Sequence, residues 1–547
     1  MYDYILSVFS SAINKLGITE FKLVFEAPKV DSHGDASTNV AMTLAKQLGK
    51  PPRAIAQSIV DALEYDVQFV QKVEIAGAGF INVTFTTDYY AHALNEIFRV
   101  GKNYGKVNVG AGKKANVEYV SANPTGPLHP GHGRNIMLGD TIANLLEWNE
   151  YSVTREYYFN NAGNQMNNLA KSVYARYRQQ LGEPDFPFDE TNGYKGEYIS
   201  LIASEIVSEY GDNLKAGTED DVAICRKKGE TWCFASIQKT LARLGVKHDV
   251  FFNEHSLYTD GKITETVEAL RSKGLVYEQD GATWIKTSEL GLEKDKVIIK
   301  STGEPTYRLP DMAYHKIKCE RGDDIIVDIF GADHISTVQE VLAGVKAMGF
   351  DTDKIKVILH QMVSFIKDGQ PYKLSKRNGE QVTLDDLMDD ISVDVVRYFF
   401  NMRSADTQLV FDMTVAQEQS DKNPVFYLQY AHARCANVFA KATERELTPQ
   451  LDTADVTLLT HVAELSLIKI IQKFPIIVQR ACMNLEPHTV ADYLREVAAA
   501  LHVFYHECRI LDAEPSVREA RFVLVNVAQT TLKNGLTILG VSAPDKM

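Results

Sequence analysis

The chain has 547 residues, of which 45% are hydrophobic and 24% are charged. This balance is typical of globular proteins and excludes an intrinsically disordered chain, and the length predicts about three to five domains. The sequence contains no apolar run of about 18 residues, as a membrane span would require. Its six cysteines are scattered without a C-x-x-C pair, which argues against structural zinc and disulfides and favours a reducing cytosol.

The net charge of −14 is concentrated in the middle of the chain. Residues 1–110 contain 10 Lys and Arg against 11 Asp and Glu, and residues 421–547 contain 13 against 14, so each end has a net charge of −1. Subtraction leaves −12 for residues 111–420. Because nearly neutral ends can still present local basic faces, the charge alone neither favours nor excludes nucleic acid as a partner.

Residues 1–110 combine helix and strand patterns and predict an N-terminal α+β domain. Helices are expected around 37–48 and 51–64, a strand–turn–strand unit is expected at 73–85, and the Gly- and Lys-rich stretch 100–114 is the best candidate for a linker. The helix expected at the start of the chain presents one apolar stripe, formed by Ile5, Phe9, Ile13 and Leu16.

Residues 111–380 predict an α/β core. A β-rich strand at 116–120, an amphipathic helix at about 132–148 and a strand at 152–159 form a βαβ unit. Such a unit requires a parallel sheet with ligand sites at the carboxyl ends of its strands. Further strands are expected at 324–334 and 354–365, a β-rich patch at 275–301, and insertions at about 165–300.

From residue 381 to the end, nearly every stretch has helical periodicity. We therefore expect an α/β protein whose core is a doubly wound, Rossmann-type parallel sheet. An N-terminal α+β domain at 1–110 precedes the core at 111–380, and an all-α helical bundle at 381–547 follows it.

The loop SANPTGPLHPGHGRN at 121–135 carries the first chemical motif. It follows the first strand of the βαβ unit and ends where the helix begins, so the free N–H groups of the helix can hold phosphate. Gly131 lets a nucleotide approach the backbone, and His129 and His132 can donate hydrogen bonds to phosphate oxygens as negative charge builds. On these residues alone, a loop with two solvated histidines is an equal alternative.

A second motif, KLSKRNGE at 373–380, places Lys373 and Lys376 on either side of a serine. Lysine suits a mobile phosphate clamp, because its ammonium is a compact charge on a flexible stem, and it can stabilise a pyrophosphate leaving group. Alone, the motif is more typical of a solvated basic loop. Its position after the last strand favours a site shared with the histidines, since one nucleotide across the edge of the sheet would touch both motifs.

These motifs resemble those of a known family. HPGHG is similar to the HIGH signature of class I aminoacyl-tRNA synthetases, and KLSKR is similar to their KMSKS signature. The longer block VEYVSANPTGPLHPGHGRN resembles arginyl-tRNA synthetases, and three further blocks, PTYRLPDMAYH, GADH and FYLQYAHAR, agree in order and spacing. The end of the sequence, LGVSAPDKM, resembles the C-terminus of bacterial members. The resemblance covers essentially the whole chain. Two positions depart from the signatures: Pro130 stands where HIGH has isoleucine, and Arg377 where KMSKS ends in serine.

The resemblance implies an enzyme, an arginine–tRNA ligase. Arginine and ATP, with Mg²⁺, would give arginyl-adenylate and pyrophosphate, and the arginyl group would then pass to the 3′-terminal adenosine of the cognate tRNA with release of AMP. It implies no tightly bound cofactor, no zinc and no metal ligand in the protein. The partners would be tRNA, L-arginine and ATP rather than a membrane, and we expect a monomer in the cytoplasm.

The amino-acid site of such an enzyme must hold a guanidinium, which is planar, always charged and best bound by carboxylates. Glu118 lies on the first strand and is expensive to bury without a partner. Tyr307 and Asp311 are four residues apart and would share one face of a helical turn, although ordinary packing for Tyr307 and a helix N-terminal role for Asp311 stay open. By resemblance, the arginine-binding residues are Glu118, Ser121, Asn123, Tyr307, Asp311 and His334.

The ATP contacts follow partly from the helix start and partly from the strand ends. Gly331 permits a close approach of the nucleotide, and Asp333 either accepts ribose hydroxyls or is a turn residue. The catalytic candidates are His129, His132, Lys373 and Lys376. The ATP-binding candidates are Gly131, His132, Asn135, Gly331, Asp333, Met362, Val363 and Lys376.

The helical C-terminal region resembles the anticodon-binding domain of several class I synthetases, and the N-terminal segment resembles the family's domain that touches the tRNA elbow. Aromatic side chains can stack on unstacked loop bases. The tRNA-binding candidates are Tyr427, Tyr430 and Met547. Helix packing for the two tyrosines and a frayed tail for the methionine are equal alternatives.

Two other functions stay open. A class I synthetase for another amino acid is disfavoured by the acidic pocket candidates and the absence of zinc ligands in the sequence. A non-catalytic RNA-binding paralogue is disfavoured because both histidines and both lysines are present. No inserted segment resembles a hydrolytic editing domain, and a charged pocket can reject near-cognate amino acids without one.

Overall fold

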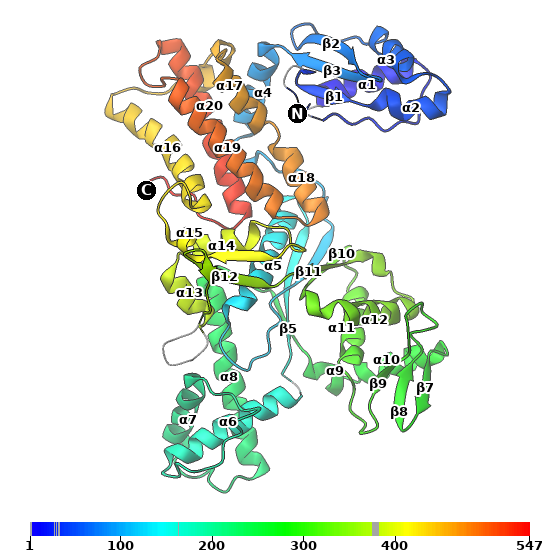
Figure 1. The fold of residues 1–547 in the computed structure, drawn as a ribbon, viewed down its shortest axis with the longest axis vertical. Helices are drawn as coiled ribbons and strands as arrows, with labels where there is room; N and C mark the ends of the chain where they lie inside the picture. The colour runs from blue at the N-terminus through cyan, green and yellow to red at the C-terminus, as the bar shows by residue number, and fades with distance from the viewer. Residues whose placement is uncertain (1–2, 27, 29, 31–32, 162, 375–381) are drawn as a thin grey trace.

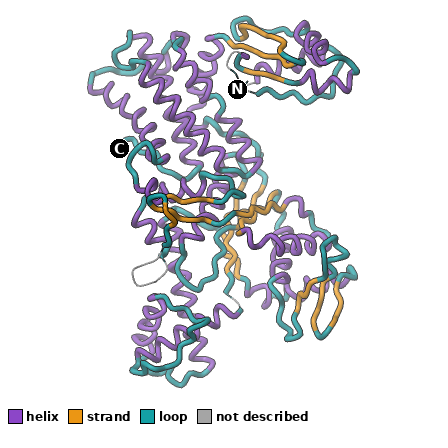
Figure 2. The backbone as a smooth tube through the Cα atoms, in the orientation of Figure 1, coloured by secondary structure: helices purple, strands orange, loops and turns teal. Residues whose placement is uncertain are grey.

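The computed structural model describes residues 3–26, 28, 30, 33–161, 163–374 and 382–547 (Figure 1). A central group of strands separates a helical C-terminal region above it from two lobes below it, and a small α+β module lies at the upper right (Figure 2). Within these ranges, no helix combines the length and the apolar character that crossing a bilayer demands.

The N-terminal module consists of α1 (Asp3–Lys15), β1 (Ala36–Thr38), α2 (Val40–Leu48), α3 (Pro52–Asp61), β2 (Val70–Ala76) and β3 (Phe80–Phe85). Its strands form an antiparallel sheet of order β1-β3-β2, and β2 and β3 are the expected strand–turn–strand unit. Helix α1 buries Ile5, Phe9 and Ile13, as its apolar stripe predicts. Leu16 lies beyond the helix end and is exposed, so the stripe stops one turn earlier than expected.

A helix, α4 (Thr87–Val100), connects this module to the helical C-terminal region and packs against it. The stretch 100–114, expected to be a linker, is anchored to the same region. Tyr104 is buried, and its hydroxyl donates a hydrogen bond to the carbonyl oxygen of Ile471 at 2.8 Å. This stretch is therefore a packed connection rather than a free tether.

The core is a parallel sheet built from β4 (Lys114–Glu118), β5 (Ser152–Phe159), β6 (Val250–Asn253), β10 (Ile325–Gly331) and β11 (Ile355–His360). The strand order is β11-β10-β4-β5-β6, and every neighbouring pair is parallel. The chain winds outward from β4 through β5 and β6, and on the other side through β10 and β11. The predicted doubly wound fold is confirmed, and the winding direction reverses between β4 and β10, where such sheets bind ligands.

The crossovers between these strands carry the insertions. Helix α5 (Pro130–Trp148) joins β4 to β5, and α12 (Ile335–Ala347) joins β10 to β11. Between β5 and β6 the chain forms the lower-left lobe of Figure 1, with α6 (Asn164–Gln180), α7 (Glu197–Tyr210) and α8 (Glu219–Arg243). Between β6 and β10 it forms α9 (His255–Thr259), α10 (Lys262–Ser272), the antiparallel strands β7 (Val276–Gln279), β8 (Ala282–Ile285) and β9 (Lys296–Ile299), and α11 (Arg308–Glu320).

The expected single strand at 354–365 is in fact two strands in different sheets. After β11 the chain breaks and forms β12 (Val363–Lys367), which pairs with β13 (Gln370–Pro371) and β14 (Leu409–Asp412). The apolar run is continuous across the break, so hydropathy alone does not reveal it. The break turns the chain away from the core sheet at its carboxyl edge.

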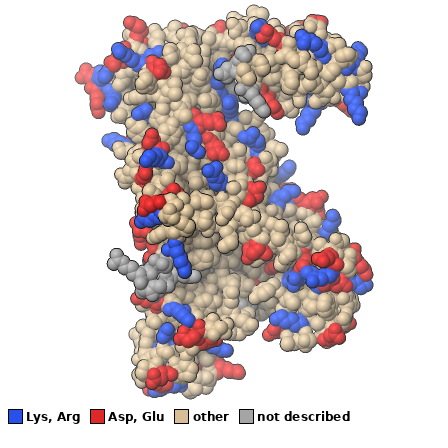
Figure 3. Space-filling view, in the orientation of Figure 1, with Lys and Arg blue, Asp and Glu red and all other residues tan. Residues whose placement is uncertain are grey.

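The C-terminal region is helical, as expected, and contains α13 (Leu384–Asp390), α14 (Val393–Asn401), α15 (Met413–Gln417), α16 (Pro424–Glu444), α17 (Val462–Ile471), α18 (Phe474–Asn484), α19 (His488–Glu507) and α20 (Pro515–Ile538). Buried apolar residues of the N-terminal module, the core sheet and these helices form one continuous core, whereas each lower lobe has a core of its own. Basic and acidic side chains intermingle on the face shown in Figure 3, which is hollowed between the N-terminal module and the lobe below it.

Candidate active site

The histidine loop, residues 121–135, meets the N-terminus of α5 at the switch point of the sheet. His129 caps the helix, because its Nδ1 accepts a hydrogen bond from the backbone N–H of Gly131 at 3.1 Å. The Nδ1 of His132 in turn accepts from the backbone N–H of His129 at 3.1 Å, and the two ring centroids are 3.8 Å apart. Since both Nδ1 atoms accept, each neutral ring carries its proton on Nε2 and presents an N–H donor there.

The His132 ring is neutral at physiological pH. Burial, and then the neighbouring His129, lowers the pKa of His132 to about 4. The neutral ring can therefore donate a hydrogen bond to phosphate from Nε2 without placing a positive charge on the imidazole. Gly131 is required beside it, since a Cβ atom there would lie 2.7 Å from Cε1 of His129. The geometry suits a phosphate that lies against the helix N-terminus.

Two hydrogen bonds tie the histidine loop to the lysine segment, residues 361–384. The guanidinium of Arg134, which is fully buried on α5, donates to the carbonyl oxygen of Gln361 at 2.8 Å. At the other end of the segment, the backbone N–H of Leu384 donates to the carbonyl oxygen of Leu128 at 2.7 Å. Both ends of the segment therefore contact the histidine loop. Such proximity is required if one nucleotide is to touch both motifs.

The two lysines expected to be catalytic lie within this segment. Lys373 is described and exposed. Lys376 lies outside the described residues, as does Arg377. The structure thus brings the two described ends of the segment to the histidine loop, and the roles of the two lysines stay predictions.

The backbone between β4 and the loop is strained. Val120 and Ser121 have φ angles of 69° and 42°, in the left-handed region, which costs about 1–3 kcal/mol for such residues. Asn135 of α5 holds this turn, because its side-chain oxygen accepts from the N–H of Val120 at 2.6 Å while its amide donates to the carbonyl oxygen of Ile329 at 2.7 Å. Asn135 therefore bridges β4 and β10 across the switch point, and its expected ATP contact stays a prediction.

Carboxylates gather at the same edge of the sheet. Asp311, in the first turn of α11, is half-buried, and no other described residue engages its carboxylate in a hydrogen bond or ion pair. Burial raises the pKa of Asp311 to about 7; the charge of His315 opposes this rise, whereas the charges of Glu118 and Glu254 add to it. A cationic ligand would relieve both causes, so this carboxylate is suited to a guanidinium.

Glu118 is held in place from two sides. The hydroxyl of Ser121 donates to Oε1 of Glu118 at 3.0 Å, and the buried Lys318 pairs with Oε2. The oxygen of Ser121 also accepts from the backbone N–H of Tyr158 at 3.1 Å. Ser121 therefore orients Glu118, which explains why both residues belong to one expected site.

The other arginine-site candidates lie at the rim. Tyr307 is 78% exposed, and its carbonyl oxygen accepts from the N–H of Asp311 at 3.3 Å, so the two share a helical turn as their spacing predicts. The side chain of His334 is 57% exposed. The amide of Asn123 donates to the side chain of Gln165 at 2.5 Å, which ties the histidine loop to α6. Of these three residues, Tyr307 is the one in contact with Asp311, and the arginine-binding roles of all three stay predictions.

The candidates for the nucleotide follow the ends of β10 and β11. Gly331 ends β10, and a Cβ atom there would lie 2.5 Å from Oδ1 of Asp333. The Asp333 side chain is exposed, Met362 is 80% exposed in the break after β11, and Val363 is half-buried at the start of β12. The carboxyl edge of the sheet therefore carries all four, and their contacts with ATP stay predictions.

Comparison with known proteins identifies the family. Residues 94–407 match the family model described as "tRNA synthetases class I (R), catalytic domain". The chain belongs to the arginyl-tRNA synthetase family. Residues 3–85 match "Arginyl tRNA synthetase N terminal domain", and residues 428–547 match "DALR anticodon binding domain".

Relatives of the synthetase span its whole length. An arginine--tRNA ligase of Salinibacter ruber is 46% identical over 100% of both chains, and one of Desulfotalea psychrophila is 46% identical over 96% of this chain and 95% of its own. The solved arginyl-tRNA synthetase of Thermus thermophilus aligns over 100% of both chains with a TM-score of 0.77 at 21% identity, which shows the shared fold. The resemblance inferred from the motif blocks is confirmed.

Three residues that lie at the candidate site were not predicted from the sequence. Arg134 follows the HPGHG block directly, but its two carbonyl partners lie on distant loops. Glu254 directly follows β6, and the rule that ligands bind at the carboxyl ends of strands could have found it. Lys318 lies seven residues after Asp311 on α11, a spacing that returns to the same face of a helix.

The tRNA candidates lie together on one helix and the tail beside it. Tyr427 is half-buried on α16, whereas Tyr430 is exposed there. The C-terminal tail is attached to the same helix, since Nδ1 of His432 lies 2.9 Å from the carbonyl oxygen of Pro544. Met547 ends this tail and is exposed. Two candidates therefore share α16 and the third lies on the tail attached to that helix, and RNA contact stays a prediction.

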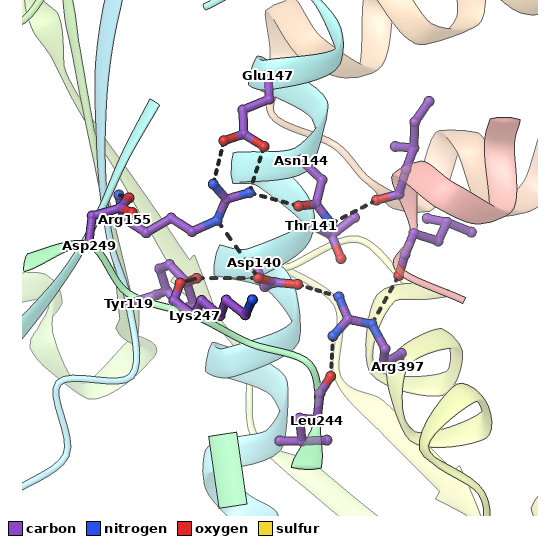
Figure 4. A network of polar contacts seen from close by, with 12 residues as sticks. Tyr119, Asp140, Thr141, Asn144, Glu147, Arg155, Leu244, Lys247, Asp249 and Arg397 are labelled. Carbon is purple, nitrogen blue, oxygen red and sulfur yellow. Dashed lines mark hydrogen bonds and ion pairs between the residues drawn. The ribbon is translucent and has the colours of Figure 1, made fainter. Parts of the chain in front are cut away.

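A buried polar network attaches α5 to the C-terminal region (Figure 4). Asp140 of α5 pairs with Arg397 of α14, and Arg155 of β5 approaches the same carboxylate at 3.9 Å. Arg397 also donates to the carbonyl oxygens of Leu244 at 2.6 Å and Leu539 at 3.5 Å. The helix that carries the histidine loop is therefore fixed to the residues that follow α20.

Proposed function

We propose that this protein is an arginine–tRNA ligase, which activates L-arginine with ATP and charges the cognate tRNA. The observation that carries the proposal is the carboxylate of Asp311 at the switch point, which no other described residue engages in a hydrogen bond or ion pair, together with a loop whose imidazoles present N–H donors. A cation and a triphosphate therefore have adjoining sites on one edge of the sheet. Family membership over the whole length supports the same activity.

In the first step, a carboxylate oxygen of arginine bonds to the α-phosphorus of ATP, and the bond to the pyrophosphate oxygen breaks. His129 and His132 donate from Nε2 to the phosphate oxygens on which negative charge builds. Lys373 and Lys376 neutralise the departing pyrophosphate. Mg²⁺ enters as the complex with ATP.

In the second step, the 2′-hydroxyl of the terminal adenosine of tRNA bonds to the carbonyl carbon of arginyl-adenylate, and AMP leaves. Asp311 holds the guanidinium in both steps, with Glu118 and Tyr307 beside it. The amino-acid site is completed by Ser121, Asn123 and His334. The nucleotide site comprises Gly131, His132, Asn135, Gly331, Asp333, Met362, Val363 and Lys376.

Each of the three domains has its own role in binding or charging tRNA. We assign residues 1–110 to contact with the tRNA elbow, 111–380 to catalysis and 381–547 to the stem and anticodon-binding region, with Tyr427, Tyr430 and Met547 as contacts. We propose a monomer that acts in the cytosol. All six cysteines are free, which fits a reducing compartment.

An aminoacylation assay over the twenty amino acids tests the proposal. Purified protein, ATP, Mg²⁺ and tRNA are expected to give arginyl-tRNA and no other product, with an ATP-free reaction as the control. Charging of a different amino acid would assign the chain to another class I specificity. Binding of tRNA without any aminoacyl product would instead favour a non-catalytic RNA-binding paralogue.

A further inference from the structure

Acidic side chains lie side by side on the core sheet, and one of them, Glu118, belongs to the proposed arginine site. Asp328 of β10, Glu118 of β4 and Glu156 of β5 are register partners on adjacent parallel strands, and they therefore point to the same face. Each is at most 3% exposed. Carboxylates buried this deeply need cationic or hydrogen-bonding partners.

The cations that face this acid row (Asp328, Glu118 and Glu156) come from one side of α11 and from the residue that caps its C-terminus. Lys318 is fully buried, and its Nζ donates to Oδ1 of Asp328 at 2.6 Å and pairs with Glu118. Arg321, three residues further along, donates to Oε2 of Glu156 at 2.5 Å. Residues three apart share a helix face, so each cation lies over its own part of the row.

His315 completes the pairing and connects the row to the pocket. Its Nε2 lies 3.1 Å from Oδ2 of Asp328, and its Nδ1 lies 2.8 Å from the carbonyl oxygen of Asp311. Both partners are acceptors, so both ring nitrogens donate and the ring is charged. Burial alone would lower the pKa of His315, but the hydrogen bond and charge of Asp328 outweigh it and raise the pKa. The positive charges of His315, Lys318 and Arg321 therefore balance the negative charges of the acid row.

We propose that Lys318 is a positioning residue for arginine recognition. Its ammonium keeps Glu118 and Asp328 inside a neutral cluster and fixes the register of α11 over the sheet. An incoming guanidinium then meets the carboxylate of Asp311, which lies seven residues earlier on the same face of α11. This inference rests on the proposed function and concerns a residue that does not touch the amino acid.

Removal of the ammonium would act on the pocket in two ways. Glu118 and Asp328 would be left buried and uncompensated, so they would pull α11 out of register or compete with Asp311 for the guanidinium. Either change misplaces the guanidinium against Asp311. The nucleotide is held by the histidine loop on α5, and its binding is not expected to change.

Steady-state charging by the Lys318→Met variant tests this role, because methionine keeps the length and apolar stem of lysine without its charge. The KM for arginine is expected to rise about 10–100-fold, the range seen when a remote change misplaces a bound group. The KM values for ATP and tRNA are expected to stay within about twofold. The matched control is Lys316→Met, the same substitution on the same helix at a lysine that pairs with Glu320 and Glu265 rather than with the acid row, and its KM for arginine is expected to stay within about twofold.

A folded Lys318→Met variant with the wild-type KM for arginine would overturn the inference, and so would equal rises in the KM for arginine and for ATP. If that variant does not fold, the double variant Lys318→Met, Asp328→Asn replaces it, since it removes one charge of each sign. The same rise in KM for arginine is expected there, and an unchanged KM again overturns the inference. The wild-type protein is assayed in parallel, because its failure to charge arginine would refute the proposed function rather than the role of Lys318.

Discussion

Replacement of Asp311 by asparagine is expected to stabilise the free enzyme at alkaline pH and to abolish its response to arginine. In the native protein, burial raises the pKa of Asp311 to about 7 from an ordinary value of 3.8. The unfolded chain therefore loses this proton at a lower pH than the folded chain. The stability that the protonated group contributes is full below pH 3.8 and is lost as the pH rises through about 7. Asparagine cannot ionise, so the variant does not lose stability at this position as the pH rises.

The magnitude follows from the pKa difference. About three pKa units correspond to about 4 kcal/mol at pH 8, and allowance for the half-buried position of the carboxyl gives a gain of about 2–4 kcal/mol for the variant. At pH 4.5 the unfolded carboxyl is only partly ionised, and the gain falls to about 1 kcal/mol or less. A functional carboxylate thus destabilises the empty site, and saturating arginine should offset this difference, since a ligand at about 1,000 times its Kd adds about 4.1 kcal/mol to the wild type alone.

Calorimetric unfolding at both pH values, with and without arginine, measures these differences. We expect a higher Tm for Asp311→Asn than for the wild type at pH 8 without arginine, a smaller difference at pH 4.5, and an arginine-induced rise in Tm only in the wild type. The matched control is Asp333→Asn, the same change at an exposed carboxylate, with no gain in Tm expected. A variant less stable than the wild type at pH 8, or one still stabilised by arginine, would refute the reasoning.

Three further outcomes are expected. The KM for arginine should rise about tenfold per pH unit below pH 7, because protonated Asp311 cannot pair with a guanidinium, and a KM that is flat between pH 5.5 and 8 would contradict this. His132→Ala should lower the rate of arginine-dependent ATP–pyrophosphate exchange by about 10²–10³-fold through loss of the Nε2–H donor, and an unchanged rate constant would exclude that role. Asn135→Leu should reduce the free energy of unfolding by about 1–3 kcal/mol in denaturant titrations, because the N–H of Val120 and the carbonyl of Ile329 lose their shared partner, and unchanged stability would show that the bridge is dispensable.

Local signals in the sequence were sufficient for much of the fold. The β-rich run before the histidine loop, the glycine and proline residues within it and the helical period after it predict the loop between β4 and α5, and both elements to within two residues of their observed bounds. Local signals did not predict features that depend on contacts between residues far apart in the sequence. The break after β11 depends on the carbonyl of Gln361, which Arg134 holds from another element, and the connection after α4 depends on the contact between Tyr104 and Ile471.

The candidate site shows the same division. The chemistry of guanidinium predicts a carboxylate, and the helical spacing of Tyr307 and Asp311 places one at the right turn. That Lys318 pairs with Glu118 and Asp328 rather than with Asp311, however, depends on which residues neighbouring strands place side by side. A linear motif does not show these contacts. In the same way, Asn135 is recognisable as part of a helix start, but its bridge between β4 and β10 follows only from the strand order.

A structure of the protein with arginine and a non-hydrolysable ATP analogue tests the central claim most directly. The guanidinium is expected within hydrogen-bond distance of the Asp311 carboxylate, about 2.7–3.2 Å, and a phosphate oxygen within the same distance of Nε2 of His132. A guanidinium bound elsewhere, or a triphosphate that does not contact the histidine loop, would contradict the account.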